Sequence, residues 1–65
     1  MSANNFLLIT KTKDGKYRVS NVDADGSGGF YISVKAYRTL RMAIMAAEDY
    51  ASENEVEYGV KFGRI

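Results

Sequence analysis

Cysteine, histidine, proline and tryptophan are all absent from this 65-residue sequence. Without cysteine and histidine the chain has no zinc-finger or zinc-ribbon pattern, no Cys or His ligand for haem, and no nucleophile–base pair built on these side chains. Disulfides are excluded as well, and because small secreted domains usually depend on them, we expect a cytoplasmic protein. No apolar run approaches the roughly 20 residues of a membrane helix, and Met1–Asn5 is not typical of a signal peptide, so we expect no membrane partner.

The residues that are present have the composition of one small folded domain. Hydrophobic residues make up 46% of the chain and charged residues 26%, which is typical of globular proteins. The net charge of +1 requires neither a nucleic-acid nor a membrane partner. A core of this size rarely contributes more than ~3–5 kcal/mol, so oligomerisation is an expected source of further stability. We treat residues 1–65 as a single domain with a loose N-terminus over residues 1–5.

The first part of the chain predicts a β-hairpin. Residues 6–10 form a short apolar run, residues 17–22 alternate as a strand does, and the Asp-Gly pair between them is a strong turn signal. A two-residue turn sets apolar residues opposite polar ones across the hairpin. A three-residue loop with Gly15 in the left-handed conformation pairs Thr12 with Lys16 and matches apolar with apolar residues on both faces, and we prefer it for that reason.

A single helix is predicted in the second half of the chain. Its start lies between Ala36 and Thr39, the latter being a suitable N-cap, and its end lies at Ser52 or Glu53. Asn54 suits the left-handed residue that often follows a helix. Seven residues share one side of this helix at a 3.6-residue period: Tyr37, Leu40, Ala43, Ile44, Ala47, Tyr50 and Ala51.

Two more strands are predicted by strict alternation, at residues 30–34 and at residues 55–62. Residues 6–9 are apolar on both faces, as in a central strand, whereas residues 30–34 are apolar on one face, with Phe30, Ile32 and Val34 together. We therefore place the last strand beside the first and parallel to it. The predicted fold class is α+β, in the order βββαβ, with a four-stranded mixed sheet of order 3-2-1-4 and one helix on one face.

The other face of this sheet has no helix to cover it. An apolar patch on an uncovered face of a small domain usually marks an interaction surface. By alternation this face carries Phe6, Leu8, Thr10, Arg18, Ser20, Val22, Tyr31, Ser33, Glu57 and Lys61; the last strand puts Val56, Tyr58, Val60 and Phe62 on the helix side. Methionines on the outer side of the helix suit adaptable protein contacts. The predicted interface residues are Phe6, Leu8, Val22, Tyr31, Met42 and Met45.

Basic residues suggest a second kind of site. Cations crowd the hairpin and the start of the helix, whereas Glu48, Asp49 and Glu53 lie toward the end of the helix, which is the reverse of what the helix dipole favours. A modestly dipolar surface explains this arrangement, and so does a site for phosphate or nucleic acid at the helix N-terminus. The candidate anion-binding residues are Lys11, Lys13, Lys16, Arg18, Lys35, Arg38 and Arg41.

Acidic residues give no comparable signal. Asp23, Asp25 and Ser27 match the opening of a calcium-binding loop, but Val34 stands where the bidentate glutamate is required, so we expect an ordinary loop and no metal. The carboxylates at 48–49 and 53–57 have no nucleophile, phosphate loop or histidine near them. We therefore expect no enzymatic activity and no cofactor.

The order of elements resembles the N-terminal domain of HicB-type antitoxins, a partial ribonuclease-H-like unit. The resemblance covers residues 16–50 and rests on Tyr17-x-Val19, on the segment Gly29–Val34, and on Thr39–Leu40 followed by Ala43 and Ala47. The family's Pro-Gly-Cys segment and its DNA-binding tail are missing here. The resemblance implies the fold, and a role in binding and restraining another protein.

Two functional hypotheses follow from these patterns. The first is a small non-enzymatic interaction module, such as a bacterial or phage accessory or inhibitor protein, that self-associates or docks on another protein through its helix-free sheet face. The alternative is a nucleic-acid or phosphate-binding protein that uses the basic hairpin and the helix N-terminus, with Tyr31 and Phe6 available for stacking. Salt dependence distinguishes them, because phosphate binding weakens steeply with salt and apolar docking does not.

Overall fold

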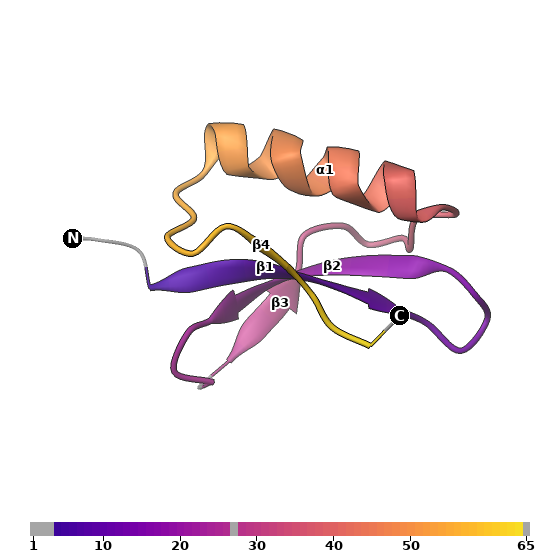
Figure 1. Ribbon diagram of the computed structural model, residues 1–65, viewed down its shortest axis with the longest axis horizontal. Coiled ribbons are helices and arrows are strands. Elements are labelled where there is room, and N and C mark those ends of the chain that lie inside the picture. Colours follow the sequence, from indigo (N-terminus) through magenta and orange to yellow (C-terminus); the bar gives the residue numbers. More distant parts are fainter. Residues whose placement is uncertain (1–3, 27, 65) are drawn as a thin grey trace.

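A computed structural model describes residues 4–26 and 28–64 and has the predicted α+β architecture. A four-stranded mixed sheet has the order β3-β2-β1-β4, and one helix packs on one of its faces (Figure 1). The elements are β1 (Asn5–Lys11), β2 (Tyr17–Asp23), β3 (Gly29–Tyr31), α1 (Leu40–Glu53) and β4 (Val60–Phe62). The sheet order predicted from the two-sided apolar character of residues 6–9 is therefore confirmed.

The β1–β2 hairpin has the three-residue loop. The amide of Thr12 donates to the carbonyl oxygen of Lys16 at 2.7 Å, and Gly15 has a φ of +83°. This closure sets Ile9 opposite Val19, so that apolar side chains meet across the hairpin. The Thr12 hydroxyl also bonds to the Asp14 carboxylate and accepts the amide of Lys16 at 3.0 Å, which closes the loop with side-chain as well as backbone bonds.

β1 lies in the centre of the sheet because β4 returns beside it in parallel. The amide of Leu7 donates to the carbonyl of Gly59 at 2.9 Å, and the amide of Gly63 donates to the carbonyl of Ile9 at 2.8 Å. Beyond β4, the amide of Lys11 reaches the carbonyl of Arg64 at 3.0 Å. The C-terminal segment thus accompanies β1 over its whole length.

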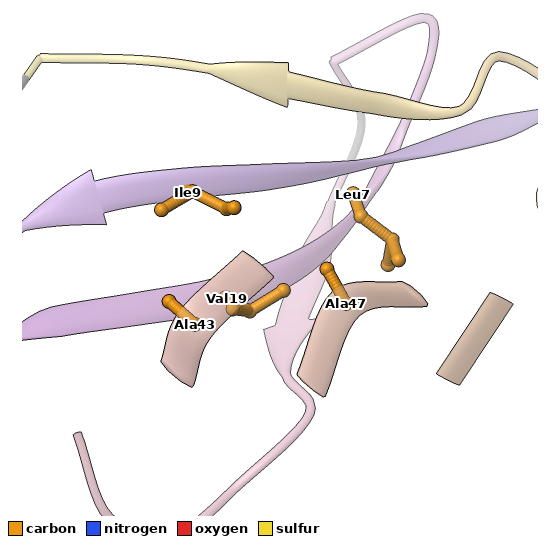
Figure 2. Close-up of a cluster of buried hydrophobic side chains, with 5 residues drawn as sticks. All are labelled: Leu7, Ile9, Val19, Ala43 and Ala47. Carbon is orange, nitrogen blue, oxygen red and sulfur yellow. The ribbon is translucent and has the colours of Figure 1, made fainter. Parts of the chain in front are cut away.

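The core lies between the sheet and α1. Leu7 and Ile9 of β1 and Val19 of β2 are buried against Ala43 and Ala47 of the helix (Figure 2). Because alanine has a small side chain, the helix approaches the sheet closely at these two positions. The seven helix-side residues predicted from the 3.6-residue period all belong to this cluster or pack against it.

Both ends of α1 are capped by side chains, and one cap differs from the prediction. Thr39 is the N-cap, and its hydroxyl accepts the amide of Met42 at 3.1 Å. Asn54 is extended (φ −130°) and not left-handed. Its backbone amide and its side-chain amide both donate to the carbonyl of Tyr50, at 2.9 and 3.1 Å. The amide side chain of asparagine therefore replaces the left-handed turn that its sequence position suggested.

The strand predicted at residues 30–34 ends at Tyr31. Continued pairing would set Val34 opposite Tyr17, but Tyr37 takes that place, with backbone bonds of 2.7 and 2.8 Å. The chain between Ile32 and Tyr37 is therefore three residues longer than continued pairing requires, and it bulges out of the sheet. As a result Val34, which was predicted on the same side as Phe30 and Ile32, is 94% exposed. We call this segment, residues 33–36, the bulge.

The strand predicted at residues 55–62 begins only at Val60. Gly59 has a φ of +74°, and this left-handed residue breaks the alternation that the prediction extended back to Glu55. Tyr58 was predicted on the helix side with Val60; its ring instead lies 6.0 Å from Nζ of Lys61, which points to the opposite face. Glu57, predicted on the uncovered face, lies before this break and outside the strand.

Asn4 and Asn5, which were expected in a loose N-terminus, are held by hydrogen bonds to the rest of the fold. Asn5 is buried as the first residue of β1, and the carbonyl of Asn4 accepts the amide of Ala24 at 2.8 Å. The side chain of Asn5 bonds to Asn21 Oδ1 (2.8 Å) and to the carbonyl of Glu55 (3.2 Å). Residues 1–3 lie outside the described part of the chain.

Candidate functional site: an open sheet face and two charged ends

The sheet face opposite α1 is covered by no element of the described chain (Figure 1). We call it the open face. Phe6, Leu8 and Val22 on this face are half-buried, and Tyr31 is 57% exposed. Part of the burial of Leu8 comes from Gly63, where an added Cβ would lie 3.3 Å from Leu8 Cδ1. The four apolar residues that the alternation assigned to this face therefore lie there. Leu8 is covered more than expected, because Gly63 at the edge of the sheet lies against it.

Two cations lie against aromatic rings of the open face. The guanidinium carbon of Arg18 is 3.7 Å from the centre of the Tyr31 ring, and Nζ of Lys61 is 4.9 Å from the centre of the Phe6 ring. Such contacts hold a cation by the negative face of the ring. Arg18 is further fixed because Nη2 donates to the carbonyls of Ser33 (3.2 Å) and Val34 (3.4 Å). Arg18 therefore anchors the bulge to the sheet.

A shallow depression of about 420 Å³ lies at the β3 side of the open face. Gly29 lies in this lining and packs tightly on β2, since an added Cβ would come within 2.8 Å of the carbonyl oxygen of Asn21. The depression has both apolar and polar lining atoms, which suits a side chain or a loop of a protein partner. Its lining residues are Ser20, Val22, Gly26, Gly28, Gly29, Phe30 and Tyr31.

The two methionines predicted as interface residues do not join this surface. Met42 and Met45 are exposed on α1, in the layer on the other side of the sheet. The predicted set of six interface residues therefore divides into four on the open face and two on the helix. A separate depression of about 360 Å³ adjoins Met45 and is lined mainly by Glu48, Asp49 and Ser52.

The fold brings the predicted anion-binding residues to one end of the molecule. The hairpin loop, the bulge, the start of α1 and Arg64 all meet there, as the Tyr17–Tyr37 pair and the Lys11–Arg64 bond show. In Figure 1 this is the end where the hairpin turn and the C-terminus lie. We call it the basic end. It contains eight cations: Lys11, Lys13, Lys16, Arg18, Lys35, Arg38, Arg41 and Arg64.

Asp14 is the acidic residue of the basic end. Its carboxylate lies 4.0 Å from Nζ of Lys16. The Thr12 hydroxyl, then the backbone amide of Asp14 and the charge of Lys16, lower the pKa of the Asp14 carboxyl below its ordinary value of 3.8. Asp14 is therefore charged at neutral pH, and the basic end has a net charge of +7 from its eight cations and one carboxylate.

The opposite end of the molecule is acidic. Asp23 pairs with Asn5, which also contacts the carbonyl of Glu55 and the amide of Glu57 (3.2 Å), so these segments meet at one place. The C-terminal half of α1 points to the same end. This acidic end has seven carboxylates, which belong to Asp23, Asp25, Glu48, Asp49, Glu53, Glu55 and Glu57. With Lys61 near the middle, charges of +7 and −7 combine into the net +1 of the whole chain.

The described part of the calcium-loop pattern forms a turn. Asp23 and Asp25 lie on a turn in which the amide of Gly26 donates to the carbonyl of Asp23 at 2.9 Å. Ser27 lies outside the described residues. Within residues 4–26 and 28–64, no three acidic residues are grouped closely enough to hold a metal ion.

Comparisons with known proteins do not indicate a function for this site, which we therefore interpret from its own residues. No protein-family model, no curated protein and no solved structure matches the chain. Among the described residues, the 14-residue helix α1 is too short and too polar to cross a membrane. Because one fold serves many functions, the architecture by itself does not select one.

Two residues of the site were not singled out from the sequence. Arg64 reaches the basic end because its segment accompanies β1, and Tyr58 reaches Lys61 because Gly59 turns the chain. The direction of the last strand was a usable signal for Arg64, since a strand parallel to β1 ends beside the hairpin loop. Nothing local in the sequence distinguishes Gly59 from a glycine within a strand.

Proposed function

We propose that this chain is a non-enzymatic protein-interaction module that docks through its open face. The observation that carries this proposal is the contrast within β1: Leu7 and Ile9 are fully buried, whereas Phe6 and Leu8 are apolar and face a side without a covering layer. Burying a large apolar side chain completely contributes ~1.5–3 kcal/mol, so these residues favour a partner surface. The resemblance to the protein-binding domain of antitoxins supports the same class of function.

The partner that the charges favour is a second copy of the chain. If two copies meet face to face and antiparallel, the basic end of each lies opposite the acidic end of the other. Such an arrangement has two-fold symmetry, as most dimers do. Charge complementarity of this kind gives both orientation and speed of association.

The size of the open face is consistent with a small dimer interface. In the view of Figure 1, down the shortest axis, the helix and the sheet are stacked vertically, so the open face extends along the longest and shortest dimensions, 37 and 18 Å. These dimensions belong to the whole molecule, so a rectangle of 37 × 18 Å, roughly 670 Å², is an upper limit for the open face, against about 800 Å² buried by each partner in a standard interface. We therefore expect a dimer with a dissociation constant in the micromolar range, on the order of 1–100 µM.

Leu8→Lys tests this proposal, with Met45→Lys as the matched control. Both substitutions replace an apolar side chain by a charge, one on the open face and the other on the outer side of α1. Sedimentation velocity over about 1–300 µM, a range that brackets weak association, should show a dimer for the wild type and Met45→Lys, and a monomer for Leu8→Lys. A wild type that stays monomeric rejects self-association, and equal behaviour of the two variants rejects the open face as the contact.

A further inference from the structure

We propose that the basic end is a second binding site, which takes the phosphate backbone of a nucleic acid without reading its sequence. Seven of its eight cations have exposed side chains, and the eighth, Arg18, is half-buried. They come from the hairpin, the bulge, the first turn of α1 and the C-terminal segment. Phosphate contacts in protein–nucleic acid complexes are made by such Lys and Arg residues and by helix N-termini, and all of them meet at this end.

The site is held rigidly by contacts that do not involve its exposed cations. The backbone pair of Tyr17 with Tyr37 joins the hairpin to the start of α1, with bonds of 2.8 and 2.7 Å. Arg18 fixes the bulge through two carbonyls, and Thr39 caps the helix. The exposed cations are therefore displayed from a fixed frame, and binding does not require the frame to be ordered first.

Three features of this end are unfavourable without an anionic ligand. Arg38 lies just before the N-cap Thr39 and Arg41 lies in the first turn of α1, so two like charges flank the start of the helix. They lie at the positive end of the helix dipole, and the first turn of α1 contains no acidic residue. The end as a whole has a net charge of +7 within a molecule whose net charge is +1. A row of phosphates makes all three features favourable.

The distribution of charge also defines how the ligand lies. Seven carboxylates at the far end of a molecule 37 Å long repel a polyanion, so a nucleic acid contacts the basic end and not the length of the sheet. The other two dimensions are 23 and 18 Å, so we expect the basic end to contact only a few successive phosphates of one strand, about three or four. The guanidinium groups of Arg38, Arg41 and Arg64 suit phosphate because they bind it with two parallel bonds.

The experiment measures binding of a fluorescent single strand of about 20 nucleotides by anisotropy, between about 25 and 200 mM salt. For three to four phosphate contacts, the logarithm of the association constant should fall with the logarithm of salt with a slope of about −2 to −3. Arg41→Glu should weaken binding by about tenfold or more and make the slope shallower by about 1. Circular dichroism of each variant verifies that the fold is retained.

Lys61→Glu is the matched control, because it changes the net charge by the same amount at the middle of the sheet. At about 150 mM salt, where the Debye length is about 8 Å, it should weaken binding by less than about threefold, because the charge at Lys61 is then screened from the basic end. Equal losses in Arg41→Glu and Lys61→Glu would overturn the site, and so would a wild type that does not bind at the lowest salt.

Two further measurements separate this site from other interpretations. Polyglutamate of equal charge should compete at least about tenfold more weakly than unlabelled DNA if the site takes a nucleic acid. Equal competition would overturn the assignment to nucleic acid and indicate an acidic protein, because arginine also binds carboxylates with two bonds. At a protein concentration well below the dissociation constant of the proposed dimer, where the wild type is a monomer, Leu8→Lys should bind DNA with wild-type affinity. Under that condition the test of the basic end does not depend on self-association through the open face.

Discussion

The two faces of the sheet are built from the same strands but differ in the burial of their side chains. On the covered face, Leu7 and Ile9 of β1 are completely buried against Ala43 and Ala47. On the open face, Phe6 and Leu8 of the same strand keep part of their surface exposed. Both pairs are equally hydrophobic, so hydrophobicity does not explain the difference. What decides burial is whether a second layer lies above the strand.

Polar groups differ between the faces in the same way. On the covered side, Asn5, Asn21 and Tyr50 form a chain in which Asn5 Nδ2 donates to Asn21 Oδ1 (2.8 Å) and Asn21 Nδ2 donates to the Tyr50 hydroxyl (3.0 Å). On the open side, Arg18 lies on the ring of Tyr31 and contacts two carbonyls of the bulge. The buried groups depend on each other, whereas water can replace the partners on the open side.

The largest predicted effect tests the apolar contrast directly. Ile9→Ala should lower the free energy of unfolding by about 2–5 kcal/mol, because it leaves a cavity beneath the helix. Leu8→Ala should cost less than about 1.5 kcal/mol at low concentration, where the open face is free, since part of its surface is already exposed. The free energy of unfolding is measured for both variants by urea unfolding at a few micromolar. This concentration is roughly below the dissociation constant expected for a dimer. Equal costs would mean that the open face is covered within the monomer.

A smaller effect is expected from the polar groups. Asn5→Ala should cost about 1–3 kcal/mol, because Asn21, Glu55 and Glu57 lose a partner in a buried place. Arg18→Ala should cost less than about 1 kcal/mol, because the carbonyls of Ser33 and Val34 then bind water. The midpoints of urea unfolding distinguish the two, with Ser52→Ala as an exposed control. A larger cost for Arg18→Ala would show that the bulge is part of the cooperative unit.

The smallest effect concerns the loop that joins the two central strands and belongs to neither face. The Thr12 hydroxyl lowers the pKa of Asp14 below 3.8 in the folded state, so its stabilising contribution is present above that pH and is lost as the pH falls through the folded value. The thermal midpoint of the wild type should therefore decline below about pH 4 slightly more than that of Asp14→Asn. Thr12→Val should remove the same difference; an unchanged pH dependence in both variants would contradict this role of the loop.

Much of this fold could be predicted because each decisive position has a local cause. Gly15 permits the left-handed conformation of the hairpin loop, Thr39 caps the helix, and the two-sided apolar run of β1 requires a neighbour on each edge. The errors have physical causes of another kind. Val34 continues a perfect alternation, but the bulge depends on Arg18 and on the Tyr17–Tyr37 pair, both distant in sequence. Gly59 likewise turns the chain without any neighbouring turn residue to indicate it.

The candidate sites were predictable in part for the same reason. Alternation places Phe6, Leu8, Val22 and Tyr31 on one face, because strand geometry is local. Separation of charge along the molecule is not local: Arg64 and Lys11 are brought together only by the parallel return of β4. The net charge of +1 gives no indication of this separation of charge. Once the sheet order is inferred, the directions of the strands are sufficient to predict the separation of charge.

The parallel pairing of β1 with β4 has a consequence for the newborn protein. About 50 residues separate Lys11 from Val60, so β4 is made well after β1. The β1–β2 hairpin joins neighbouring segments and can form within about 10 µs once both strands are free to fold. Until β4 pairs with it, β1 has an unpaired edge that is open to neighbouring polypeptides. Conditions that delay this last pairing should therefore favour aggregation of newly made chains.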